Sequence, residues 1–581
     1  MVSKFLSKGK ILSKGKKIFT SPQNSVLSAA TIIMFMVIVS RVLGLVRQRV
    51  LAHFFTASEL SLFFAAFRLP DLVFEVLVFG TFSSAFIPVF TRSLKKGSES
   101  AWDVASYVVN LGLLVFIVFS FLLGLSADKI YALFAPGFET TEIDTVARLA
   151  RVLFAAQGFF VISYVLTGVL ESLRRFLVPA LAPLFYNLGI ILGTFFLSSR
   201  FGLFAPAFGV VIGAFLHFMI QLPLAIKLGF RFKPAIQIND AVKRIGKLAY
   251  PRMIEVVFLQ FSKVAELFFS SLISKSAYTY YTFGNTLQLL PIGIFGTSIA
   301  KAALPALSSE AGSKTNFRRI LFNSLYEMLF LLIPITFVFI VLRIPIVRLV
   351  YGTDIFSWEA TVQTGYVVSA FAIGIGFQAG STLLARGFYA LHDTKTPVIV
   401  SIISILLIVL GDFIFIKILR FDVWGLAVAF SIGSAFQAIT LFYLINKKIE
   451  GGLFIKVIFP IAKSLLAAFC SGSVMFSILK IFDRSVWVKR LSFLGKLEST
   501  KTIPFERFVL DTRYTANLLI LTFVVSLVGA LVYLGVSLIL KNDQVWTFYK
   551  LVRRVLLKRR LAPIPEEQEP VTPTPTDSAS E

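Results

Sequence analysis

The sequence Phe79-Gly80-Thr81, followed by Ala85-Phe86-Ile87-Pro88, returns later in the chain as Phe295-Gly296-Thr297, followed by Ala302-Ala303-Leu304-Pro305. A Leu-Pro pair precedes both copies, at residues 69–70 and 290–291. The two glycines are 216 residues apart, the two final prolines 217, and Pro179 and Pro397 repeat the spacing at 218. Because separated landmarks share nearly one offset, the spacing predicts an internal duplication. The alternative is coincidence, since glycine and proline are common in membrane helices.

Long apolar stretches surround these motifs. Hydrophobic residues make up 57% of the 581 residues and charged residues 15%, which excludes an ordinary soluble protein. About fourteen stretches are long enough to cross the roughly 30 Å hydrocarbon core as helices. Their centres lie near Met36, Phe82, Val115, Phe160, Ile190, Ile212, Phe268, Ile299, Ile335, Ile375, Leu406, Phe430, Leu466 and Val525. We therefore expect an all-α polytopic membrane protein of about 14 transmembrane helices.

The duplication divides these helices into two groups. Each repeat holds six, and because six is even both copies share one orientation, as a parallel repeat with a substrate site between the lobes. The architecture is then two six-helix lobes plus two C-terminal helices. The expected boundaries are 1–24 for a basic cytoplasmic tail, 25–226 for the N-lobe, 227–447 for the C-lobe, 448–540 for the last two helices with a long loop, and 541–581 for a tail that is basic, then disordered.

The net charge of +26 comes mainly from basic residues at the ends of the predicted helices, so we expect no nucleic acid partner. Basic breaks alternate with breaks poorer in Lys and Arg, such as 51–59 and 140–146. The positive-inside rule then places both termini in the cytoplasm. Residues 484–513 fit this less well, because they lie on the outer side in this scheme and carry seven Lys or Arg.

Several common chemistries are not indicated. Cys470 is the only cysteine, and His53, His217 and His392 are dispersed without metal-ligand spacing. The sequence Gly312-Ser313-Lys314-Thr315 lacks the preceding glycine of a phosphate-binding loop. We therefore expect no metal, no cofactor and no enzymatic activity.

Further motifs occur in a characteristic order. They are Ser40-Arg41-Val42-Leu43-Gly44-Leu45-Val46-Arg47, Ala66-Phe67-Arg68-Leu69-Pro70, Pro179-Ala180-Leu181-Ala182-Pro183, Leu290-Pro291-Ile292-Gly293-Ile294-Phe295-Gly296, Leu304-Pro305-Ala306-Leu307-Ser308 and Phe388-Tyr389-Ala390-Leu391-His392-Asp393-Thr394-Lys395-Thr396-Pro397. In these motifs, which cover the first twelve helices, the chain resembles the MurJ (MviN) lipid II flippase family of the multidrug, oligosaccharidyl-lipid and polysaccharide exporter superfamily.

The resemblance implies a transporter of the bacterial cytoplasmic membrane that serves peptidoglycan synthesis. Such proteins move lipid II, an undecaprenyl-diphosphate-linked saccharide, by alternating access, with the lipid tail in a groove near the last two helices. A cationic cavity between the lobes receives the diphosphate, and here Arg47 and Arg41 would bind it. The alternative is that both arginines only reach the membrane interface. Membrane lipids, cell-wall synthesis proteins and a driving ion, Na+ or H+, are the other expected partners.

The chain departs from the family pattern at several charged positions. Gln48 and Ser61 stand where the family usually has acidic residues. Where the second helix of the family carries Arg-Arg and then Glu, this chain has Phe74, Glu75 and Phe79, and where the eighth helix carries Asp-Arg it has Asn285 and Thr286. Two arginines expected to bind the diphosphate, at Phe74 and Thr286, are therefore absent.

The seventh predicted helix carries charges that could replace them. Arg252, Glu255, Lys263 and Glu266 share one helix face, which in a membrane helix points into the protein. We expect Lys263 and Arg252 to bind substrate, and Glu255 and Glu266 to position these cations or couple transport to an ion. The alternative is an internally neutralised stripe at a lobe interface, because the charges form two i,i+3 pairs of opposite sign.

Two further sets of residues have a structural and a functional interpretation. Arg68, Asp71 and Glu75 lie three or four residues apart, so they could form an intrahelical charge ladder, or Asp71 and Glu75 could take part in transport. The second set consists of residues that permit helix bending, which packing alone would also explain: Gly80, Pro88, Pro291, Gly296 and Pro305.

Two rival functions remain open. The altered cationic set would permit export of another polyprenyl-diphosphate-linked oligosaccharide. A non-transporting scaffold would instead recruit cell-wall enzymes through its tails, tolerate Arg47→Ala and lose function without residues 541–581. A transporter would show the opposite behaviour.

Overall fold

The computed structural model describes residues 26–79, 82–450, 454–482, 515–547 and 549. Within these ranges, twelve helices are long and apolar enough to cross a membrane. Two further helical rods complete the predicted fourteen: α2 (Val26–Phe54), which carries three arginines, and a broken rod of α4 (Arg68–Phe74), the π-helix η1 (Glu75–Phe79) and α5 (Phe82–Lys96). The predicted all-α polytopic membrane protein is confirmed.

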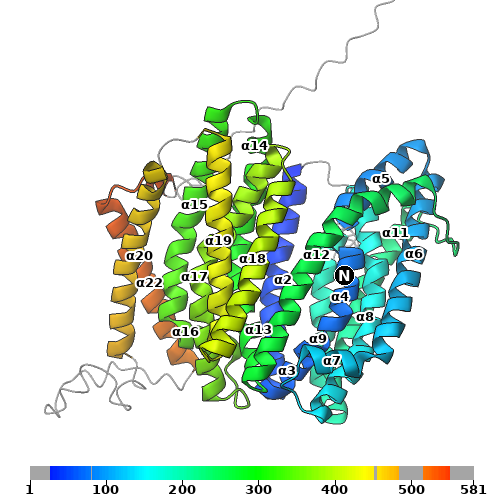
Figure 1. Ribbon diagram of the computed structural model, residues 1–581, viewed down its shortest axis with the longest axis horizontal. Helices are drawn as coiled ribbons and strands as arrows, with labels where there is room; N and C mark the ends of the chain where they lie inside the picture. The colour runs from blue at the N-terminus through cyan, green and yellow to red at the C-terminus, as the bar shows by residue number, and fades with distance from the viewer. Residues whose placement is uncertain (1–25, 80–81, 451–453, 483–514, 548, 550–581) are drawn as a thin grey trace, which may run out of the picture.

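The helices divide into the two predicted lobes and a C-terminal pair (Figure 1). The other N-lobe elements are α3 (Ala57–Ala66), α6 (Ser98–Leu125), α7 (Ala127–Phe134), α8 (Thr140–Ser172), α9 (Leu177–Phe201), α10 (Phe204–Met219) and α11 (Leu222–Lys227). The C-lobe elements are α12 (Asp240–Ile273), α13 (Ala277–Pro291), η2 (Ile292–Gly296), α14 (Thr297–Ser309), α15 (Lys314–Val341), α16 (Arg343–Tyr351), α17 (Trp358–Ala390), α18 (Lys395–Phe413), η3 (Ile414–Ile418) and α19 (Trp424–Lys448). The last pair, α20 (Phe454–Phe482) and α22 (Thr515–Ile539), packs against α15 on the side away from the N-lobe.

The duplication is visible in the positions at which equivalent elements begin. α6 and α15 begin 216 residues apart, as do α7 and α16. The π-helical segments η1 and η2 begin 217 residues apart, and α8 and α17 begin 218 apart. Even the short α7 and the single π turn therefore recur, which confirms the parallel repeat.

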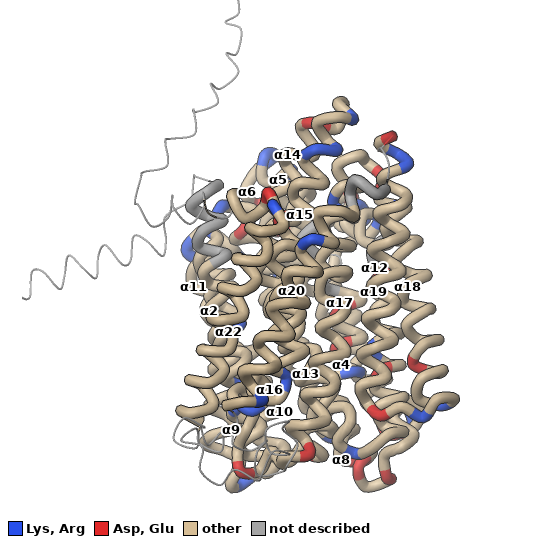
Figure 2. The backbone as a smooth tube through the Cα atoms, turned by 90° about the vertical axis from the view of Figure 1, so that its left-hand side faces the viewer, with Lys and Arg blue, Asp and Glu red and all other residues tan. Residues whose placement is uncertain are grey.

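The bundle has one end rich in Lys and Arg residues and one without that excess (Figure 2). Arg174 and Arg175 lie in the turn between α8 and α9 at the first end, and Lys395 and Lys448 lie at the ends of α18 and α19 there. We call it the basic end; it is at the top of Figure 1. The short helices α3, α7 and α16 lie at the opposite end.

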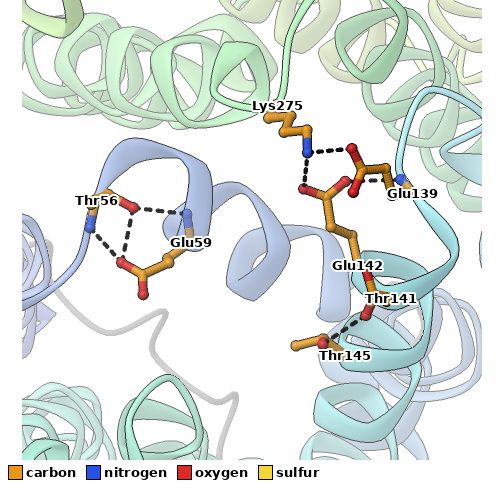
Figure 3. Close-up of polar contacts among 7 residues, drawn as sticks. All are labelled: Thr56, Glu59, Glu139, Thr141, Glu142, Thr145 and Lys275. Atoms are coloured by element: carbon orange, nitrogen blue, oxygen red, sulfur yellow. Dashed lines mark hydrogen bonds and ion pairs between the residues drawn. The ribbon is translucent and has the colours of Figure 1, made fainter.

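The lobes touch closely at this opposite end. The backbone N–H of Gly137, in the turn before α8, donates to Ser271 Oγ of α12 at 3.2 Å. A Cβ atom at Gly137 would lie 2.0 Å from the carbonyl oxygen of Ser271, so no larger residue fits without a shift. Beside this contact, Lys275 Nζ lies 2.7 Å from Glu139 and 3.2 Å from Glu142 (Figure 3). Hydrogen bonds to these two carboxylates raise the pKa of Lys275.

The N-lobe contains a helix pair packed through glycine. A Cβ atom at Gly189 of α9 would lie 2.3 Å from the Cα of Gly213 of α10, and one at Gly193 would lie 2.4 Å from the Cα of Gly209. Both helices carry glycine at i and i+4, which lets the two backbones approach in a membrane. α2 packs against α9 of this closely packed pair.

The predicted bending residues lie in or beside interrupted helices. Pro88 and Pro305 are inside α5 and α14, while Pro291 ends α13 and Gly296 ends η2. A π turn is a common site of a helix kink. Gly296 also has a packing role, because a Cβ atom there would lie 2.8 Å from that of Ala379. Gly80 lies outside the described residues, and bending during transport stays a prediction.

Candidate functional site

The arginines of α2 lie between the two lobes. The Nε of Arg47 is buried and has no hydrogen-bond partner among the described residues, and its charged group interacts electrostatically with Tyr186 of α9 and Tyr351 of α16. Arg41 is exposed and lies against η2, since a Cβ atom at Gly293 would be 3.8 Å from its Nη2. Arg49 differs from both, because its Nη1 donates to the carbonyl oxygen of Leu349 at 2.7 Å. Arg47 therefore keeps one buried donor atom, Nε, without a hydrogen-bond partner among the described residues.

Two positions at which the chain departs from the family pattern touch each other. Gln48 Nε2 donates to Thr286 Oγ1 at 2.9 Å, and Tyr351 donates to Gln48 Oε1 at 2.9 Å. The first pair joins α2 to α13 across the lobes. The resemblance implies an acidic residue at the position of Gln48 and an arginine at that of Thr286, whereas this chain has a neutral hydrogen-bonded pair there.

The other departures are also accommodated locally. Ser61 and Thr279 share a hydrogen bond of 2.9 Å between their hydroxyls, so the second lost acidic position again faces a neutral partner in the C-lobe. The ring of Phe74 packs 5.5 Å from that of Tyr164, and Asn285 accepts a hydrogen bond from Gln288 at 2.9 Å. None of these three positions provides a cation.

Lys263 forms an ion pair with a carboxylate of the opposite lobe. Its Nζ lies 2.8 Å and 3.0 Å from the two carboxylate oxygens of Glu75 in η1, and Gln260 also donates to this carboxylate. The predicted i,i+3 partner, Glu266, interacts with Lys263 electrostatically but does not form this close pair. Lys263 thus connects α12 to the N-lobe, and its binding of substrate stays a prediction.

Other charges complete a group that we call the interlobe cluster: Arg68, Asp71, Glu75, Lys263 and Glu266. Asp71 accepts a hydrogen bond from Gln157 at 2.6 Å, and the guanidinium of Arg68 lies 5.9 Å from the ring centre of Tyr278. Glu266 hydrogen-bonds to Tyr281, and Arg68 interacts electrostatically with all three carboxylates. The cluster therefore combines interactions along the α4–η1 rod with interactions across the lobes.

Among the described side chains of α12, the predicted site residue Glu255 does not join this cluster. Glu255 is half-buried and lies eight residues before Lys263, about 12 Å along the helix axis. The side chain of Arg252 lies outside the described residues. The structure brings together four of the predicted residues, namely Lys263, Glu266, Glu75 and Asp71.

Asp412 of α18 is a functional candidate that sequence reasoning missed. Its side chain is 1% exposed, and neither carboxylate oxygen has a hydrogen-bond partner among the described residues. It interacts electrostatically with Glu266. The available signal was a single acidic residue within an otherwise apolar helix. No group of three or more potential metal-ligating His, Cys, Asp or Glu side chains occurs within the described ranges.

Sequence comparison places the chain among known proteins. The family described as "Lipid II flippase MurJ" matches residues 50–497. A "Probable lipid II flippase MurJ" of Vibrio cholerae is 30% identical over 437 residues, which cover 72% of this chain and 82% of the relative. One of the same name from Borreliella burgdorferi is 25% identical over 488 residues, or 81% of this chain and 92% of the relative.

Solved structures give a concordant result. The chain is similar to "Lipid II flippase MurJ, inward closed conformation", with a TM-score of 0.70, 25% identity, and coverage of 88% of this chain and 99% of that one. A multidrug resistance transporter of the MATE family in an inward-facing conformation shares the fold at a TM-score of 0.61, with 15% identity over 71% of this chain and 94% of that one. The resemblance found in the sequence motifs is confirmed, and the chain belongs to the MurJ lipid II flippase family.

Proposed function

We propose that this protein translocates lipid II across the cytoplasmic membrane by alternating access of its two lobes. The observation that carries this proposal is Arg47, whose buried Nε lacks a hydrogen-bond partner among the described residues. A guanidinium inside a membrane protein is costly, and one that also leaves a donor unsatisfied calls for an anionic ligand. A diphosphate supplies oxygens that match the planar fork of arginine.

Arg41 extends the same binding surface. It lies six residues before Arg47, about 9 Å along α2, and its guanidinium lies against Gly293 of η2. The two arginines are therefore spaced to contact different parts of one large headgroup. Both arginines belong to the N-lobe. A cationic contact of the C-lobe with the headgroup therefore has to come from a different helix.

Lys263 can supply that cation by changing partners. In this structure Glu75 accepts two hydrogen bonds from it across the lobes. A phosphate that approaches Lys263 competes with Glu75 for its ammonium group. If the phosphate replaces Glu75, the ion pair between α12 and η1 is lost. Headgroup binding would thus weaken a contact that holds the lobes together, which couples substrate binding to lobe movement.

The coupling ion would act at Glu266 and Asp412. A buried ionised carboxylate without a partner is strongly unfavourable, so Asp412 has to be protonated or to bind a cation. Glu266 interacts electrostatically with Asp412 and with Arg68 and Lys263 of the interlobe cluster. Binding of Na+ or H+ at this pair would change the charge balance of the cluster.

The orientation follows from the two ends of the bundle. The excess of lysine and arginine at the basic end favours the cytoplasm for that end. The contacts of Gly137 and Lys275 would then close the outer side. In that state the substrate site would be reached from the cytoplasmic side.

Native mass spectrometry of the purified protein with lipid II tests the proposal. Arg47→Ala should lower lipid II affinity at least about tenfold, because it removes a charge-assisted contact. Arg151→Ala is the matched control, since Arg151 pairs with Asp128 on the N-lobe and lies outside the interlobe cluster. Equal binding by wild type and Arg47→Ala would contradict the assigned role of Arg47.

The exchange of an opposite-charge pair for Gln48 and Thr286 favours a second candidate, export of another polyprenyl-diphosphate-linked oligosaccharide. The same binding experiment with such a lipid separates the two. Tighter Arg47-dependent binding of that lipid than of lipid II would assign the second substrate. Indifference of both lipids to Arg47→Ala would favour the scaffold function.

A further inference from the structure

A polar cavity of about 310 Å3 lies near the basic end, between α15, α20 and the residues that follow α22. Its lining carries two cations and two anions: Lys463, Lys541, Glu327 and Asp543. Amide groups of Asn542 and Gln544 also face it. The cavity is separated from the interlobe cluster, because α20 and α22 pack on the outer side of the C-lobe (Figure 1).

The chain after α22 is folded so that these groups meet. Lys541 has a positive φ of 51°, a left-handed conformation that glycine usually occupies after a helix. The backbone N–H of Asn542 then donates to the carbonyl oxygen of Ser537 at 3.0 Å, which closes the helix end. The Asn542 side chain is 3% exposed and donates to Ser464 of α20 at 2.9 Å. A specific turn therefore fixes this part of the predicted tail against α20.

Lys463 is held at the same point. Its Nζ donates to the carbonyl oxygen of Lys541 at 3.2 Å and lies 4.8 Å from the ring centre of Phe459. One hydrogen bond leaves further N–H donors of the ammonium for a ligand. Lys463 and Lys541 thus contribute two cations to the lining of the cavity, while Glu327 on α15 and Asp543 contribute two anions.

Apolar surface continues from this cavity toward the middle of the helices. Leu466 follows Lys463 by three residues on the same face of α20 and is 52% exposed. On α22, Ile539 precedes Lys541 by two residues and is 79% exposed. Side chains of this kind face lipid in a membrane helix. A ligand that fills the cavity and contacts these residues therefore needs a charged head and apolar chains.

We propose that this cavity binds the headgroup of a glycerophospholipid that carries both a phosphate and a primary amine, such as phosphatidylethanolamine. The phosphate lies toward Lys463 and Lys541, and the ammonium donates to Glu327 and Asp543. The acyl chains follow Leu466 and Ile539. The transported substrate fits this cavity poorly, because its diphosphate would face the two carboxylates and its saccharide head exceeds the volume.

The proposal does not depend on the function of the interlobe cluster, and a matched pair of lysines tests it. Lys463 and Lys480 lie on the same helix, and each packs on the phenylalanine four residues earlier. Only Lys463 lines the cavity. In native mass spectrometry of the full chain, Lys463→Gln should bind phosphatidylethanolamine about tenfold more weakly, whereas Lys480→Gln should bind it like wild type.

Lys463→Gln also removes the hydrogen bond from Lys463 to the carbonyl oxygen of Lys541, so a second variant leaves this contact intact. Glu327→Gln should reduce the preference for phosphatidylethanolamine over phosphatidylglycerol, which has the phosphate but no amine, about fivefold. Unchanged binding and preference in both cavity variants would overturn the proposal. Full competition by phosphoethanolamine, which has the headgroup without chains, would overturn the assignment of a lipid and assign a soluble ligand.

Discussion

The two lobes share one backbone arrangement but differ in the charged residues that they carry. The π turn occurs at the same place in both, yet its first residue is Glu75 in η1 and Ile292 in η2. The charged η1 pairs with Lys263, whereas η2 presents a glycine against which Arg41 lies. The duplication therefore gives each lobe one interrupted rod, and the residues within these rods determine which lobe carries a charge there.

The difference in charge between the lobes is tested most directly at the pair of Lys263 and Glu75. Lys263→Met should lower lipid II affinity about tenfold, because it removes the cation of the C-lobe. Glu75→Gln should raise this affinity several-fold, because it frees Lys263 for phosphate. Affinities from native mass spectrometry check both changes.

Glu142→Gln is the control for this pair, since Glu142 also forms an ion pair across the lobes, with Lys275, but at the opposite end. It should leave lipid II affinity unchanged. An affinity of Glu75→Gln equal to that of wild type would show that Lys263 serves only to hold the lobes together.

The contribution of the two lobes to ion coupling should also differ, because the buried carboxylate of Asp412 lies in α18 of the C-lobe. Asp412→Asn should retain lipid II affinity within about twofold and reduce ion-driven translocation in proteoliposomes about tenfold or more. Asp422→Asn, in the turn before α19, is the control. Translocation by Asp412→Asn that still responds to the ion gradient like wild type would remove this carboxylate from the coupling mechanism.

The equivalent helix pairs α9–α10 and α18–α19 should differ in tolerance of a methyl group. Gly189→Ala sets a Cβ atom against the backbone of Gly213, which cannot turn aside, and should cost about 2–3 kcal/mol of stability. Gly433→Ala sets one 2.2 Å from Cγ1 of Ile408, a side-chain atom rather than backbone, and should cost less than Gly189→Ala. Thermal unfolding of both variants in one detergent checks the order, and equal losses would contradict it.

The smallest expected effect concerns the turn between α17 and α18. The hydrogen bond from Lys448 lowers the pKa of Asp393 to about 2, and Thr396 adds two further hydrogen bonds. Because the folded pKa is below the ordinary 3.8, the stabilisation is present above pH 4 and is lost as the pH falls toward 2. Asp393→Asn should therefore cost about 1 kcal/mol at pH 7. A penalty that does not shrink on acidification would contradict this origin.

Much of the fold could be predicted because membrane helices are specified locally. Apolar length gave the number of helices, and the repeated Gly-Thr and Pro landmarks gave the two lobes. The partners of charged residues could not be predicted in the same way. Lys263 shares a helix face with Glu266, but its closest partner, Glu75, lies 188 residues earlier in the chain. For Asp412 the sequence offered one signal, an acidic residue within an apolar helix, but the lack of hydrogen-bond partners among the described residues is visible only in the structure.

The contact of Gly137 with Ser271 has a consequence for the behaviour of the protein in different media. The neighbouring ion pair of Lys275 with Glu139 is exposed, so dissolved salt screens it. Two backbones packed through a glycine do not respond to ionic strength in this way. The backbone contact between Gly137 and Ser271 should therefore be less sensitive to salinity than the pair of Lys275 and Glu139.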